Sequence, residues 1–194
     1  MKYIIACLSI ALVTGCGSDT TSSNTRQIDF RNYKIGDSIL PLIDELEDST
    51  GVVLGVSGLN DRSYVILGVK EDGSDTYHGN DDALVNIAVW TMPNSDKIAE
   101  ISWMFPSTSN KTLFRMITNK IGEPHDTKYR SWQNAFGAQL TDELHTWRLA
   151  GNVGCEMHIR PFKDGHLVAH TDEYAAWQDQ QPRDPEEDPL EKRL

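Results

Sequence analysis

The feature that most constrains the fold is a series of short extended runs, each rich in β-branched or aromatic residues and bounded by turn residues. Runs of this length and composition are typical of β-strands. Turns rich in Gly, Asn and Asp between neighbouring runs favour antiparallel pairing. The runs are 52–57, 64–70, 84–92 and 98–105 in the first half, and 128–132, 143–150, 153–160 and 166–171 in the second.

Each series of runs follows a pattern typical of an amphipathic helix. The first helix is expected over about 39–48, and the second is expected to end at Gly122, which precedes a proline by two residues. A helix followed by four strands, twice, predicts an α+β fold of two tandem units, 28–106 and 107–177. Each unit would lay its helix on a four-stranded antiparallel sheet. Residue identity between the halves is low, so the prediction rests on the order of elements.

The N-terminal residues have the pattern of a secretion signal. Lys2 precedes an apolar run, and small residues stand before Cys16. The run is too short for a permanent transmembrane helix, which needs about 20 residues. Val13-Thr14-Gly15-Cys16 resembles the lipobox of bacterial lipoproteins, which implies removal of residues 1–15 and acylation of Cys16. An ordinary secreted protein cut near this point and an uncleaved anchor helix are the alternatives.

The lipobox resemblance also implies a location. Gly17 follows the cysteine where retention in the inner membrane would favour Asp, so we expect an outer-membrane lipoprotein facing the periplasm. Residues 16–27 are rich in Ser, Thr, Asp and Asn, which is typical of a flexible tether. The acidic segment 178–194 is expected to be disordered.

The charge balance argues against nucleic acid as a partner. The chain has 18 basic and 29 acidic residues, a net charge of −11, and removal of Lys2 with the signal leaves 17 against 29, or −12. A distributed acidic surface repels nucleic acid and anionic headgroups. Basic proteins, cations and cell-wall amines remain open as partners.

The cysteines exclude an internal disulfide after processing. Cys7 leaves with the signal and Cys16 is acylated, so Cys155 is the only free thiol. Cys155 alternates with Met157 and Ile159 in an extended run. This pattern predicts a buried small hydrophobe rather than a catalytic thiol.

The sequence has no complete catalytic or cofactor motif. Residues 55–59 come near the nucleophile elbow Gly-x-Ser-x-Gly, but the second glycine stands one place early. No P-loop, dinucleotide fingerprint or His-Glu-x-x-His is present. We therefore expect no cofactor and no enzymatic activity.

Two histidines are weak candidates for a metal site. If a three-residue loop at 163–165 joins the last two runs, His158 falls opposite His170, with Glu156 on the same face. Zinc needs three or four ligands. Two exposed histidines beside a packed face are therefore the favoured interpretation, with no metal expected.

Two stretches are candidates for partner binding. One is an acidic loop that carries Asp72, Asp75, Asp81 and Asp82, whose spacing does not match an EF-hand. It is expected to dock a basic partner or simply to be solvated. The other stretch carries Trp132 and Phe136, because aromatic side chains on a loop are common recognition elements, although core packing would also explain Trp132.

Two family resemblances point to a binding protein. Ile121-Gly122-Glu123-Pro124 at a helix end looks like the Leu-Gly-x-Pro of small outer-membrane lipoproteins of the SmpA/OmlA (BamE-like) group. Ile35-Gly36-Asp37-Ser38 resembles that group's Gly-x-Thr helix start, although here the two pieces fall in different halves. The tandem order of helix and sheet is similar to the β-lactamase-inhibitor-protein architecture. Both resemblances imply a protein that binds without catalysis.

These observations predict a membrane-anchored periplasmic lipoprotein that acts as a non-catalytic protein-binding module. Its role would be that of an envelope assembly factor, an inhibitor or an immunity protein. The alternatives are a metal-dependent envelope hydrolase built around His158 and His170, and a carrier of a small or lipidic ligand.

Overall fold

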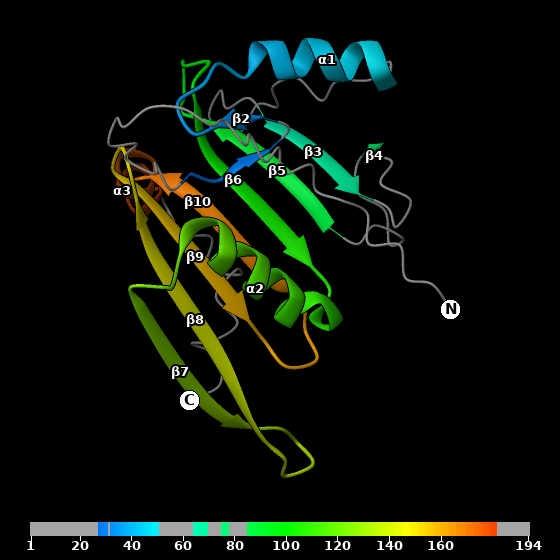
Figure 1. The fold of residues 1–194 in the computed structure, drawn as a ribbon, viewed down its shortest axis with the longest axis vertical. Coiled ribbons are helices and arrows are strands. Elements are labelled where there is room, and N and C mark those ends of the chain that lie inside the picture. The colour runs from blue at the N-terminus through cyan, green and yellow to red at the C-terminus, as the bar shows by residue number, and fades with distance from the viewer. Residues whose placement is uncertain (1–26, 31, 51–63, 70–74, 78–84, 182–194) are drawn as a thin grey trace, which may run out of the picture.

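One large antiparallel sheet dominates the computed structural model, which describes residues 27–30, 32–50, 64–69, 75–77 and 85–181. Its strand order is β4-β3-β5-β6-β10-β9-β8-β7, and β1 and β2 form a separate small hairpin (Figure 1). The strands are β1 Asp29–Phe30, β2 Tyr33–Lys34, β3 Tyr64–Val69, β4 Asp75–Tyr77, β5 Val85–Thr91, β6 Ile98–Phe105, β7 Asp126–Gln133, β8 Gln139–Leu149, β9 Val153–Ile159 and β10 Gly165–Thr171.

The predicted fold of two helix-plus-four-strand units is wrong. Strand β6 from the first half pairs with β10 from the second, from Gly165 opposite Phe105 to His170 opposite Glu100, so a single sheet crosses the expected boundary at 106/107. The halves also differ in strand order, because β3 lies between β4 and β5 whereas β7 to β10 follow one another. Joining β6 to β10 removes two exposed sheet edges that separate units would leave unpaired.

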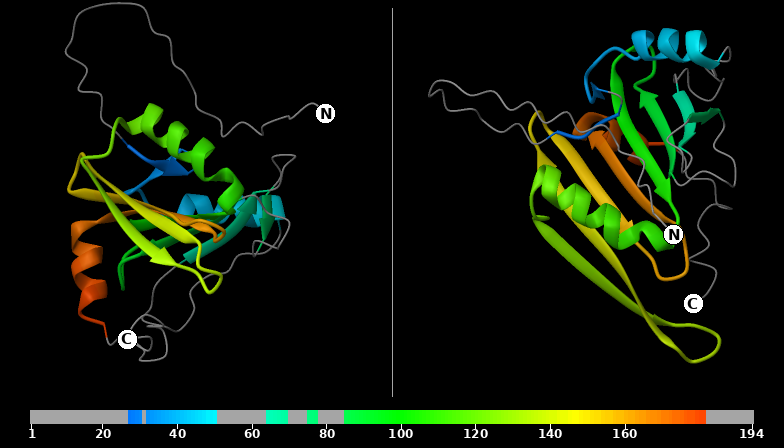
Figure 2. Two further views of the ribbon diagram at one scale, coloured as in Figure 1. Left: turned by 90° about the horizontal axis from the view of Figure 1, so that it is seen from below. Right: turned by 45° about the vertical axis from the view of Figure 1, so that its right-hand side comes forward.

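Helices α1 Leu40–Thr50 and α2 Asn110–Ile121 cover the same face of the sheet (Figures 1 and 2). Leu42 and Leu46 are one turn apart on α1 and are buried, as is Ile121 on α2. Together with the inward side chains of the central strands they form one hydrophobic core. We call this side of the sheet the covered face.

Helix α2 ends as the sequence predicts. Gly122 adopts φ 90°, and its N–H donates to the carbonyl of Thr118 at 2.8 Å. The Trp147 indole on β8 donates to the Gly122 carbonyl at 2.8 Å, which fixes the helix end to the sheet. Lys120, in the last turn, forms a 3.0 Å ion pair with Asp29 of β1. The capping residue Ser109 makes no side-chain hydrogen bond to the helix.

A third helix, α3 Asp172–Asp179, lies on the opposite side of the sheet from α2 (Figure 2). Thr171 caps it, since its hydroxyl accepts a hydrogen bond from the Tyr174 N–H at 3.0 Å. Tyr174 is fully buried. Helix α3 is not among the elements predicted from the sequence, although Thr171 followed by two acidic residues is a helix-start signal.

Several predicted elements match the described strands, and others fall outside the described residues. The runs at 64–70, 84–92 and 98–105 correspond to β3, β5 and β6. The run at 52–57 and the signal and tether up to residue 26 lie outside the described residues. Within the described ranges, no helix is both long enough and apolar enough to cross a membrane.

Candidate functional site

The side of the sheet opposite α1 and α2 carries the most chemically distinctive side chains. Successive residues of a strand point to opposite faces, so every second residue of the central strands projects away from the core. Of the described helices, α3 alone lies on this side (Figure 2). We call this surface the open face. It is formed by Glu100, Ser102 and Met104 of β6, His166, Val168 and His170 of β10, and Glu156 and His158 of β9.

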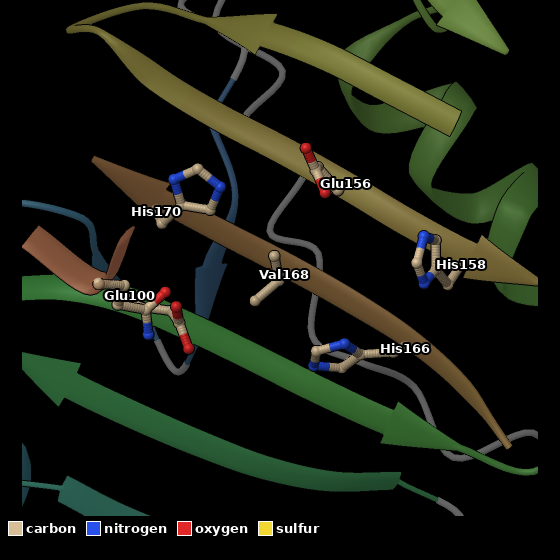
Figure 3. A pocket seen from close by; sticks show the side chains of 7 residues that line it. Glu100, Glu156, His158, His166, Val168 and His170 are labelled. Atoms are coloured by element: carbon tan, nitrogen blue, oxygen red, sulfur yellow. The ribbon is translucent and has the colours of Figure 1, made fainter. Parts of the chain in front are cut away.

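The open face contains a hollow of about 320 Å³. Imidazole and carboxylate groups make up most of its lining, and Gln178 borders it from α3. Figure 3 shows side chains from three adjacent strands meeting around it. The labelled lining residues are Glu100, Glu156, His158, His166, Val168 and His170.

The strand register brings His158 opposite His166, and the predicted pairing of His158 with His170 is wrong. The connection between β9 and β10 is longer than a three-residue loop, because β9 ends at Ile159 and β10 begins at Gly165. Within it the Arg160 guanidinium donates to the Asp164 carbonyl, at 2.9 and 3.2 Å. The turn is centred on Phe162, two residues before the expected centre at Asp164, and this shift places His166, rather than His170, next to His158.

Gly165 fixes this register from the covered face. A Cβ at position 165 would collide with the Phe105 ring and would lie 2.6 Å from Asn110 Oδ1. Only glycine therefore fits opposite Phe105, and β10 is held in its position between β6 and β9.

His170 lies over the backbone of its cross-strand partner Gly154. A Cβ at Gly154 would come within 3.1 Å of His170 Cε1. The His170 Nδ1 is 3.2 Å from the Thr171 carbonyl oxygen, which can only accept, so Nδ1 carries the proton. When the ring is neutral, its Nε2 keeps a lone pair.

His166 is half-buried and is held in its neutral form. Burial is the main cause of its lowered pKa, and the neighbouring His158 and Arg160 lower it further, against an opposing effect of Glu156. Neither His158 nor His166 has a hydrogen-bond partner among the described residues. Their ring nitrogens are therefore available to a ligand.

In the described part of the chain, no group of three or more His, Cys, Asp or Glu side chains is arranged to hold a metal ion. Glu156 and His158 share the open face two residues apart on β9, as the sequence analysis placed them. His170 lies opposite Gly154 and not beside this pair. The expected combination of His158 with His170 is thus not formed.

Two reactive-looking side chains belong to the covered face and are structural. His145 is buried, lies 2.9 Å from Thr127 Oγ1 and 3.1 Å from Glu143 Oε2, and packs on the Phe114 ring with centroids 4.3 Å apart. Cys155 is fully buried, and burial raises its pKa far above the usual range for a thiol. The predicted burial of Cys155 is confirmed.

A second candidate surface is the outer part of the β7–β8 hairpin. Strand β8 pairs with β9 only from Glu143 onward, so residues 130–142 project past the neighbouring strand as a two-stranded arm (Figure 1). Trp132 is half-buried, and its indole donates to Asp142 at 2.9 Å. Phe136, at the tip, is 95% exposed.

The tip of the arm is well ordered despite its exposure. Asn134 Oδ1 accepts hydrogen bonds from the N–H groups of Phe136 and Ala138, both at 3.0 Å. Gly137 has φ 84°, and its carbonyl accepts from the Gln133 side chain at 2.8 Å. The loop therefore presents the Phe136 ring to solvent from a fixed backbone.

The remaining predicted site residues are largely outside the described part of the chain. Cys16, Asp72, Asp81 and Asp82 fall there. Asp75 begins β4 and pairs with Val69 at an end of the sheet's strand order. The docking role expected for the acidic loop stays a prediction.

Glu100 and His166 line the hollow but are not among the site residues predicted from the sequence. Glu100 is almost fully buried on β6, opposite His170. A signal for His166 was present, since His166 and His170 alternate with Val168 on one face of a strand. Glu100 could not be found in this way, because its proximity depends on the pairing of β6 with β10.

Comparisons with known protein families, with curated proteins and with solved structures gave no match for this chain.

Proposed function

We propose that the protein is a lipid-anchored, non-catalytic binding module of the bacterial envelope that docks another protein on its open face. The observation that carries this proposal is the contrast between the two sides of the sheet. Helices α1 and α2 bury the covered face, whereas on the open face Met104 of β6 is 50% exposed, and Glu156 and His158 of β9, across β10, are exposed as well. A sheet face with mixed apolar and polar side chains suits protein recognition.

The arm supports the same interpretation. Phe136 is 95% exposed, so its aromatic ring is not part of the hydrophobic core. Aromatic side chains that become buried on association often dominate binding energy. Because the tip is already ordered, little conformational entropy is lost when a partner covers it.

The lipid anchor is the part of the proposal that rests on the sequence. Acylation of Cys16 would hold the module at the membrane, since several acyl chains give stable anchoring where one does not. A net charge of −11 favours association with a basic partner. The carrier alternative is less well supported, because the hollow is lined mainly by His and Glu side chains rather than apolar ones.

Site-specific photo-crosslinking in intact cells tests the docking surface. A photoreactive residue at position 104 or 136 of the full-length chain should give one adduct of discrete mass. The same residue at Lys111 or Arg115, both exposed on α2, should not. Met104→Asp should also weaken the adduct formed at 136 if one partner covers both surfaces. Equal adducts at all four positions, or none at 104 and 136, would refute the proposal.

The anchor is tested separately by labelling with radioactive palmitate. Wild type and Cys7→Ser should incorporate label, and Cys16→Ser should not. Label retained by Cys16→Ser would remove the lipoprotein assignment while leaving the docking surface untouched.

A further inference from the structure

The hollow on the open face contains two histidines, His158 and His166, that make no hydrogen bond to the described residues. His158 and His166 stand directly opposite each other on β9 and β10 and share the lining of the hollow (Figure 3). Opposite residues of an antiparallel pair have Cβ atoms about 4.5–5.5 Å apart, so rotation of the two side chains can bring both imidazoles to one ion. By contrast, His145 on the covered face has its ring nitrogens beside Thr127 and Glu143.

The donor set selects the class of ligand. Imidazole nitrogen suits Zn²⁺, Cu²⁺ and Ni²⁺, whereas Ca²⁺ and Mg²⁺ require oxygen ligands. The carboxylates of Glu100 and Glu156 border the same hollow and would repel an anion. A divalent transition-metal ion is attracted by both kinds of group.

We propose that His158 and His166 chelate a divalent transition-metal ion of the Zn²⁺ or Cu²⁺ class at the open face. Glu156 lies two residues before His158 on the same face of β9 and is exposed. Because it forms no ion pair with the described residues, its carboxylate can turn toward the bound ion. Water occupies the remaining coordination positions. The site supplies two imidazole ligands from opposite strand positions, and no group of three His, Cys, Asp or Glu side chains in the described chain is already arranged around an ion.

This inference does not depend on the proposed docking function. The bound ion would lie at the centre of the open face. Because it has open coordination positions, it can accept a ligand from a docked protein. His170 is not part of the chelate, since it lies opposite Gly154 and donates through Nδ1 to Thr171.

Calorimetric titration of the purified protein, without a histidine tag, with ZnCl₂ and then CuCl₂ tests the site. Wild type should bind one ion saturably, with Cu²⁺ held more tightly than Zn²⁺. His158→Ala and His166→Ala should each weaken binding by at least about tenfold, because even changes to residues outside the ligand shell cost 10–100-fold. Glu156→Gln should give a smaller loss.

His125→Ala is the matched control, because His125 is exposed but lies on the segment before β7, away from the hollow. It should bind the ion with wild-type affinity. Thermal unfolding of each variant without metal separates misfolding from ligand loss, and His158→Gln repeats the test with a side chain of similar size. Absence of saturable binding to wild type would overturn the proposal, as would unchanged binding in the folded His158→Ala, His166→Ala double variant.

Discussion

The two faces of the central strands use the same residue types in opposite ways. On the covered face, His145 lies next to Thr127 and Glu143 and packs against Phe114. On the open face, His158 and His166 face each other without a hydrogen-bond partner in the described residues. A buried polar group must be satisfied or it destabilises the fold, so unsatisfied histidines persist only where solvent or a ligand reaches them. The comparison separates side chains that build the fold from side chains available for function.

The largest difference in the free energy of unfolding is expected between alanine substitutions at Trp147 on the covered face and at Met104 on the open face. Trp147 is 2% exposed and its indole is bonded to Gly122 at the end of α2. Trp147→Ala should lower the free energy of unfolding by about 3–5 kcal/mol. Met104→Ala should change it by less than about 0.5 kcal/mol. Urea titration measures both, and equal losses would contradict the assignment of the two faces.

The next largest difference in stability is expected between alanine substitutions at His145 on the covered face and His158 on the open face. His145→Ala removes a buried ring and leaves its polar neighbours unpaired, so the free energy of unfolding should fall by about 2–3 kcal/mol. His158→Ala on the exposed side should stay within about 0.5 kcal/mol of wild type. Chemical denaturation of the two variants side by side checks this, and a strongly destabilised His158→Ala would show that His158 has a structural role.

Individual helices and strands could be predicted from the sequence, whereas their arrangement in the sheet could not. β-branched and aromatic residues between turns located β6 at 98–105, and a glycine followed two residues later by a proline located the end of α2 at Gly122, because both signals are local. The pairing of β6 with β10 is not local, since it joins residues 60 to 70 positions apart. Nothing in either strand distinguishes a partner in its own half from one in the other half, and the two-unit fold was therefore the wrong assembly of mostly correct parts.

The candidate site could likewise be predicted only as far as local sequence patterns reach. His158 and Glu156 could be placed on one face from their spacing on β9. Which histidine lay opposite them depended on where the β9–β10 turn is centred, and Gly165 restricts that choice because only glycine fits opposite Phe105. A contact with a ring from another strand is invisible in the sequence around position 165, so His170 was chosen where His166 stands.

A smaller loss of stability is expected from substitution of Gly154, which leaves room on the open face for the His170 ring. Gly154→Ala places a methyl group about 3.1 Å from His170 Cε1, so the ring must move by a few tenths of an ångström. The free energy of unfolding should fall by about 1 kcal/mol. The nuclear magnetic resonance signals of the His170 ring should shift while those of His145 remain. Unchanged His170 signals would place the ring away from Gly154.

The smallest effect is the dependence of stability on pH through His166. Its pKa in the folded protein lies below the usual value of about 6.5, mainly because the ring is partly buried. As pH falls through 6.5 the unfolded chain takes up the proton first, so His166 lowers the stability of the fold progressively on the acid side. Well above pH 6.5 the ring is neutral in both the folded and the unfolded chain, so His166 no longer lowers the stability of the fold. His166→Gln should remove this component, so that the variant gains stability relative to wild type between about pH 7 and pH 5.5. Urea titrations at several pH values measure the difference, and a constant difference across this range would mean that the open face leaves the His166 ring as solvated as an unfolded histidine.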